Sequence, residues 1–119
     1  MTPALPPLVQ RSLQRFIRAF APECILLFGS YAKGTTRTRS DVDLLIVADL
    51  PGSSAVHVRR ARQLASDCFP RIDIVFATPQ EVASADTAKS PFLSSILGTG
   101  IVVYRRPNNL RSLPASRSG

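Results

Sequence analysis

The chain has 119 residues, enough for one compact domain but not for a second of ordinary size. An apolar fraction of 45% fits a globular protein, and no apolar run approaches the roughly 20 residues of a membrane-spanning helix. The net charge of +7 favours anionic partners such as a nucleotide, a nucleic acid or an acidic protein surface. Because the first residues lack the basic-then-apolar order of a signal peptide, we expect a cytoplasmic protein.

The chain carries few residues for thiol or imidazole chemistry. Cys24 and Cys68 fit no metal-ligand spacing, and we expect two buried thiols. His57 is the single histidine, so a zinc site or a triad based on histidine would need more partners than the chain readily supplies. The arginines are dispersed without interleaved aromatic residues, which favours ordinary solvated faces over direct nucleic-acid binding.

The first half of the chain predicts a helix followed by two strands. Apolar residues recur at helical spacing up to Phe20, so we expect a helix from Pro6 or Pro7, ended by Pro22. The continuous apolar run Cys24–Phe28 predicts a strand covered on both faces. A short helix to about Lys33 and a polar loop over 35–40 lead to a second apolar strand over 42–47.

The second half predicts alternating helices and strands. Ser53 or Ser54 is placed to cap a helix whose apolar side continues to Cys68 and which Pro70 ends. A strand over 72–76 follows. Thr78 and Glu81 have the spacing of a capping box, with proline at the first helical position. A further helix begins at Ser90-Pro91, and a short strand over 101–104 closes the pattern.

These elements predict an α/β (α+β) domain, with a small mixed sheet of about four strands flanked by helices. We place the domain at residues 1–106. Residues 107–119 are rich in Pro, Asn, Ser and Arg, with little to bury, and we expect a flexible basic tail.

Gly29-Ser30 stands at a strand-to-helix junction, where unpaired backbone N–H groups suit a phosphate. Glycine lets the backbone approach the anion, the Ser30 hydroxyl can donate one more hydrogen bond, and Gly34 lets the chain leave the short helix. Alone, a Gly-Ser pair of this kind is more often a structural cap than a ligand site.

Asp41-Val-Asp43 leads directly into an apolar strand. Because side chains alternate along a strand, both carboxylates point the same way, and Mg²⁺ prefers such oxygen ligands. The competing explanation is that Asp41 caps a turn with Ser40 and Asp43 faces solvent. Asp73 favours the metal hypothesis, because a carboxylate within an otherwise apolar strand is costly unless it pairs with a charge. A salt bridge from Asp73 to Arg71 or another arginine is the structural alternative.

Together these residues resemble the DNA polymerase β-like nucleotidyltransferase superfamily, and most closely its minimal nucleotidyltransferases. The resemblance rests on Gly29-Ser30, Gly34, the run Ser40-Asp41-Val42-Asp43-Leu44, and a third acid at Asp73. It extends from the first helix to about Tyr104 and implies the polymerase β-like palm fold.

The resemblance also implies roles for these residues. Gly29 and Ser30 would hold the β- and γ-phosphates of ATP, with Gly34 and Ser40 in the same nucleotide-binding element. Asp41 and Asp43 would bind two Mg²⁺ ions. Asp73 would help to hold the catalytic ion and receive the proton of the attacking hydroxyl.

Minimal members of this family often act as antitoxins beside a helical toxin of the HEPN ribonuclease family. The resemblance therefore implies transfer of AMP to a hydroxyl of such a toxin. Two alternatives stay open: a non-catalytic module that neutralises its partner by binding alone, and a nucleotidyltransferase that acts on RNA or a small molecule.

Overall fold

The protein is described by a computed structural model that places residues 5–29, 32, 41–84 and 91–107. Its four strands form one sheet in the order β3-β2-β1-β4. β1 is antiparallel to both β2 and β4, whereas β2 and β3 are parallel. The strands are β1 (Cys24–Phe28), β2 (Val42–Val47), β3 (Ile72–Ala77) and β4 (Ile101–Arg105). This mixed α/β architecture confirms the fold class predicted from the sequence.

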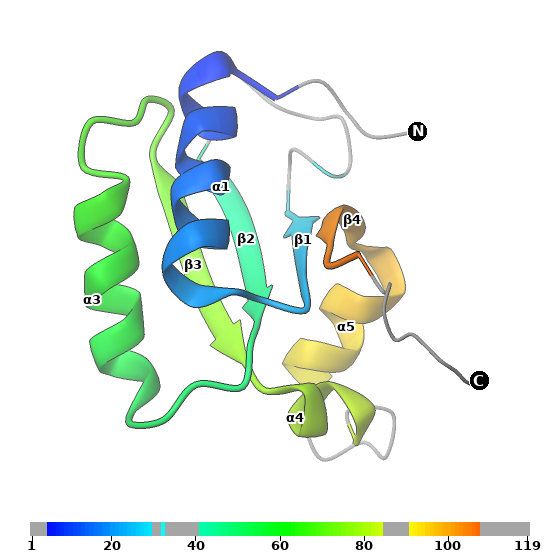
Figure 1. Cartoon of the computed structure of the whole chain (residues 1–119). Helices are drawn as coiled ribbons and strands as arrows, with labels where there is room; N and C mark the ends of the chain where they lie inside the picture. Colours follow the sequence, from blue (N-terminus) through cyan, green and yellow to red (C-terminus); the bar gives the residue numbers. More distant parts are fainter. Residues whose placement is uncertain (1–4, 30–31, 33–40, 85–90, 108–119) are drawn as a thin grey trace.

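The helices divide between the two faces of the sheet. α1 and α3 lie side by side on one face, while α5 lies on the other side of the sheet beside β1 and β4, with α4 next to the end of α5 (Figure 1). The described helices of more than one residue are α1 (Pro7–Phe20), α3 (Ser54–Leu64), α4 (Pro79–Ala83) and α5 (Pro91–Thr99). No helix within the described ranges has the length and apolar character needed to span a bilayer.

Each face of the sheet has its own apolar cluster. On the first face, α1 buries Phe16 and Val9 against the strand residues Leu44 and Ile46. Ala61 adds the contribution of α3 to the same cluster. On the other face, residues of α5 pack against the opposite side chains of the strands; this cluster contains Leu26, Leu45, Val47, Ala77, Leu93 and Ile96. The core therefore fixes which face each strand residue occupies.

The predicted caps are present. The Ser53 hydroxyl accepts a hydrogen bond from the Val56 N–H at 3.4 Å. Thr78 and Glu81 form the reciprocal capping box that starts α4. Such caps satisfy N–H groups that have no partner within the helix. The turn chemistry read from the sequence thus positions α3 and α4 as expected.

The third helix ends earlier than its apolar pattern predicted. α3 ends at Leu64 instead of continuing toward Cys68. The guanidinium Nη1 of Arg15, on α1, donates to the Leu64 carbonyl at 2.7 Å. The Cys68 N–H, which would bond that carbonyl in a longer helix, donates instead to Ala65 O. The Leu64 carbonyl therefore accepts a hydrogen bond from a side chain of α1 in place of the backbone bond that a longer α3 would supply.

Smaller differences concern strand ends. β3 and β4 each run one residue beyond the predicted bounds, to Ala77 and Arg105. Ala32 is helical, as expected for the short helix after Gly29. The remainder of that helix, the 35–40 loop, Ser90 and the 108–119 part of the predicted tail lie outside the described residues.

Candidate nucleotide and metal site

Two of the predicted acids face each other across neighbouring strands. Asp43 on β2 is the Cα partner of Asp73 on β3, in parallel register. On its other side Asp43 is paired with Phe28 of β1. Asp43 shares a strand face with Leu45 and Val47, which pack toward α5. Asp43 and Asp73 therefore lie on the sheet face opposite α1 and α3.

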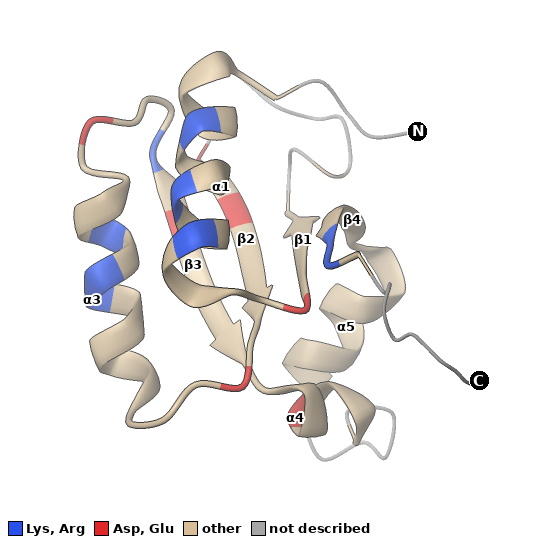
Figure 2. Cartoon of the chain, viewed as in Figure 1, with Lys and Arg blue, Asp and Glu red and all other residues tan. Residues whose placement is uncertain are grey.

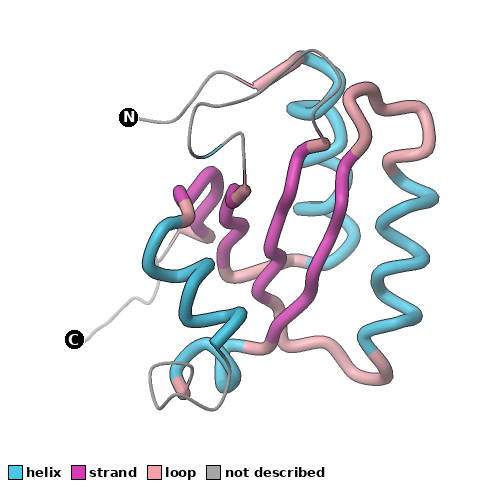
Figure 3. The backbone as a smooth tube through the Cα atoms, turned by 180° about the vertical axis from the view of Figure 1, so that it is seen from behind, coloured by secondary structure: helices cyan, strands magenta, loops and turns pink. Residues whose placement is uncertain are grey.

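The acids gather at the amino-terminal ends of the parallel strands. Asp41, which is exposed, comes directly before β2, and its position two residues before Asp43 continues the strand alternation. Figure 2 shows acidic residues on both β2 and β3, whereas many of the basic residues lie on α1 and α3, with others at the start of β3 and on β4. From behind, no described helix lies in front of the amino-terminal halves of β2 and β3 (Figure 3). This arrangement keeps the arginine-rich helices and the carboxylates on opposite faces.

Gly29 lies against the Asp43 carboxylate. It follows β1 directly and has a φ of +74°, a conformation that favours glycine. A Cβ atom at this position would overlap Asp43 Oδ2 and would lie 3.1 Å from its Cγ. The glycine predicted to admit a phosphate is thus a direct neighbour of the central acid. The absent side chain also leaves room for the carboxylate itself.

The electrostatics of Asp43 reflect its crowded position. Its pKa is raised above the ordinary aspartate value, first by desolvation and then by the negative charges of Asp73 and Asp41. Both neighbouring acids thus act on Asp43 at one end of the sheet. An added cation would relieve this repulsion.

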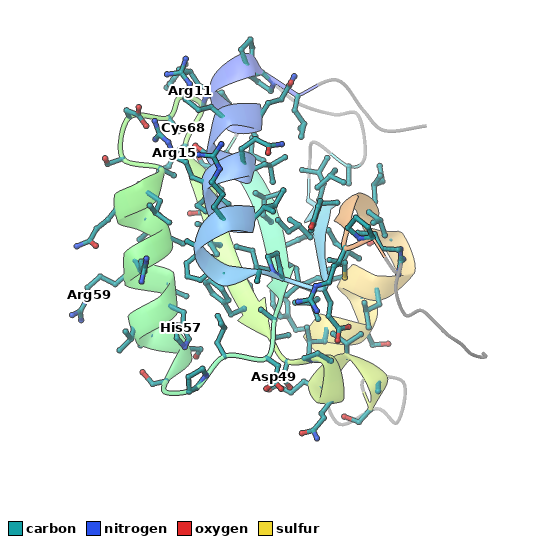
Figure 4. The ribbon with its side chains drawn as sticks, viewed as in Figure 1. Arg11, Arg15, Asp49, His57, Arg59 and Cys68 are labelled. Atoms are coloured by element: carbon teal, nitrogen blue, oxygen red, sulfur yellow. The ribbon has the colours of Figure 1, made fainter. Side chains whose placement is uncertain are left out.

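The alternative of an Asp73–Arg71 salt bridge finds no support in the described ranges. The ion pair found there joins Arg15 to Asp67 at 2.8 Å, at the end of α3. In Figure 4, Arg15 and Cys68 are labelled close to this junction, far from Asp49 at the opposite end of the sheet. Arg71 contributes through its backbone, since its carbonyl accepts the Val42 N–H at 2.8 Å and aligns β2 with β3.

The donor set fits a hard divalent cation. Mg²⁺ is commonly held by one or two carboxylates together with phosphate oxygens of a substrate, rather than by a complete protein cage. Asp43 and Asp73 supply carboxylates in register, and Asp41 supplies a third nearby. As placed, no three Asp, Glu, His or Cys side chains in the described part of the chain surround a common point. A bound ion would therefore be shared with phosphate.

The remaining predicted residues have different outcomes. Ser30, Gly34 and Ser40 lie outside the described residues, so the geometry of the phosphate-binding element beyond Gly29 stays a prediction. Sequence reasoning treated Phe28 and Phe92 only as apolar positions. Their ring centroids lie 6.1 Å apart, and Phe28 is the Cα partner of Asp43. The sequence signal that could have pointed to Phe28 is that it directly precedes Gly29, the predicted phosphate-binding glycine.

Comparisons with known proteins agree with the fold. The family model described as polymerase beta, nucleotidyltransferase matches residues 12–109, which includes all four strands. No curated protein matches the chain.

Two solved structures are similar in fold. A putative nucleotidyltransferase from Sulfolobus solfataricus is 21% identical, with a TM-score of 0.51 over 83% of this chain and 78% of that one. A structure described as a toxin-antitoxin with AMP-PNP is 25% identical, with a TM-score of 0.57 over 79% of this chain and 71% of that one.

Proposed function

Because the chain belongs to the polymerase β nucleotidyltransferase family, we propose that it transfers AMP from ATP to a hydroxyl group of a partner protein. The partner we propose is a HEPN-type ribonuclease toxin, which makes this protein its antitoxin. The observation that carries the proposal is the parallel register of Asp43 with Asp73 beside Gly29. The similarity to a toxin-antitoxin structure described with AMP-PNP supports both the nucleotide and the class of partner.

The residues have distinct roles in this proposal. Asp41 and Asp43 would hold two Mg²⁺ ions, which would supply positive charge to stabilise the phosphate groups during transfer. Gly29 gives the triphosphate close access to backbone N–H groups, and Ser30 donates a hydrogen bond to it. Gly34 and Ser40 complete the nucleotide-binding element.

The proposed reaction balances without further reactants. The acceptor hydroxyl oxygen bonds to the α-phosphorus of ATP while the bond to the bridging oxygen breaks. Pyrophosphate leaves, and AMP remains on the acceptor. Asp73 receives the proton of the hydroxyl; its register position beside Asp43 supports this role.

The test is transfer of label from α-³²P-ATP in the presence of Mg²⁺, with the protein encoded beside this one as acceptor. Asp41→Asn and Asp43→Asn should each abolish labelling of the acceptor. Asp49→Asn is the matched control, because it removes an exposed carboxylate that follows the opposite end of β2. Labelling that persists without Asp43 would contradict the proposal. Stable binding and neutralisation of the partner without any labelling would favour the non-catalytic module instead.

A further inference from the structure

An aromatic pair lies next to the acids and has no part in the chemistry proposed above. Phe28 and Phe92 meet nearly perpendicularly, with ring centroids 6.1 Å apart and an interplanar angle of 87°. Phe28 ends β1 and is half-buried, whereas Phe92 is 57% exposed at the start of α5. This edge-to-face geometry is favourable for two aromatic rings. It holds the exposed ring of Phe92 in a defined place.

The aromatic pair lies on the same face of the sheet as the acids. Phe28 is the Cα partner of Asp43, and directly paired residues on neighbouring antiparallel strands lie about 5 Å apart. By strand alternation Phe28 shares a face with Leu26, which packs toward α5 on the same side as Asp43. The row Asp73, Asp43, Phe28 therefore crosses three strands and continues to Phe92. Carboxylates occupy one end of this row and aromatic rings the other.

We infer that Phe28 and Phe92 form a stacking platform for the nucleobase of the nucleoside triphosphate. A triphosphate held at Gly29 and the acids extends its sugar and base away from the phosphates. The aromatic rings continue the row of the acids across the sheet and offer an apolar surface there, and a nucleobase stacks on such a ring through its π face. Purines, with the larger π face, should bind better than pyrimidines. This inference rests on the proposed function of the same site.

The binding experiment compares Mg²⁺-ATP with Mg²⁺-tripolyphosphate, which has the phosphates but no base. Phe92→Ala should weaken ATP binding by about tenfold, the size typical of losing one stacked ring, and leave tripolyphosphate binding unchanged. Phe69→Ala is the matched control, because Phe69 is 62% exposed on the loop leading to β3, at the opposite edge of the sheet. It should bind both ligands like the parent.

A second variant reports the stacking directly. The chain contains no tryptophan, so Phe92→Trp introduces a single tryptophan at the platform, whose emission can be excited at wavelengths where tyrosine does not absorb. ATP should quench its emission, and tripolyphosphate should not.

The outcomes separate the inference from the proposed function. If Phe92→Ala binds ATP as tightly as the parent, or if ATP leaves the Phe92→Trp emission unchanged, the platform is wrong while the triphosphate site stands. If neither ATP nor tripolyphosphate binds the parent protein, the proposed function and the platform both fail.

Discussion

Gly29 leaves open the space that the Asp43 carboxylate occupies, since a Cβ atom at position 29 would overlap Asp43 Oδ2. The obstructing atom is the end of a short side chain, which can rotate away. A substitution at Gly29 should therefore displace the carboxylate more than it disturbs the fold. The first prediction follows from this relationship.

Gly29→Ala should lose transfer activity while it loses only modest stability. Gly52→Ala is the matched control, because Gly52 also has a positive φ (+88°) but open space around its Cβ position. Both variants should lose about 1–2 kcal/mol of unfolding free energy in urea melts, from backbone strain. We expect only Gly29→Ala to lose labelling of the acceptor. Equal losses of activity in the two variants would show that strain alone is responsible.

Asp43→Asn should raise stability at neutral pH in the absence of divalent ions. The pKa of Asp43 is raised in the folded protein, so the folded state binds a proton more readily than the unfolded state. Relative to the Asn variant, the parent thus loses stability as the pH rises through that raised pKa. The difference in unfolding free energy between Asp43→Asn and the parent should be largest near pH 7. It should vanish below pH 3.8, the ordinary pKa of aspartate.

The measurement is the urea midpoint between pH 3 and pH 8, with Asp49→Asn to control for the change in net charge. A stability gain for Asp43→Asn that does not depend on pH would contradict the electrostatic cause.

Gly98→Ala and Gly100→Ala should change stability in opposite directions. Gly98 lies inside α5 with open space around its Cβ position, so alanine should stabilise by about 0.5–1 kcal/mol. A Cβ at Gly100 would lie 2.6 Å from the Ile96 carbonyl oxygen and 3.2 Å from that of Leu27. Because both are backbone atoms, Gly100→Ala should cost about 1–3 kcal/mol. Thermal melts of both variants test this, and a stabilised Gly100→Ala would show that Gly100 does not lie so close to these two carbonyls.

Asp67→Asn should weaken the attachment of α1 to the end of α3 and change its pH dependence. The hydrogen bond from Arg15 lowers the pKa of Asp67, so the parent gains stability above the ordinary aspartate range. That gain should disappear as the pH falls through the lowered pKa. Melting temperatures of the parent and Asp67→Asn should therefore converge in acid. Arg18→Gln, which changes an exposed arginine of α1, should leave the acid dependence of the parent intact.

Much of the sheet was predictable because local patterns determine it. The apolar runs at β1 and β2 gave both strands with their observed bounds, and alternation along β2 placed Asp41 and Asp43 on one face. The register of Asp73 beside Asp43 does not follow from either strand's own pattern, since the parallel pairing of β2 and β3 depends on the α3 crossover. The chemical roles of these acids stay predictions.

The features missed from the sequence depend on contacts between distant residues. At the end of α3, the Leu64 carbonyl accepts a hydrogen bond from Arg15, which lies 49 positions earlier in the chain. The Phe28–Phe92 pair likewise joins residues from β1 and α5. Neither contact produces a periodic pattern in the sequence, because each depends on how separate helices and strands pack against one another.

The strand order also has a consequence for synthesis on the ribosome. β1 pairs on one side with β4, the last strand of the described chain. As the nascent protein emerges, one edge of the apolar β1 strand stays unpaired until Arg105 has been made. Unpaired apolar edges recruit other chains, and pairings between residues distant in sequence form slowly. Release of the chain before β4 would therefore yield a fragment that aggregates instead of a shorter working protein.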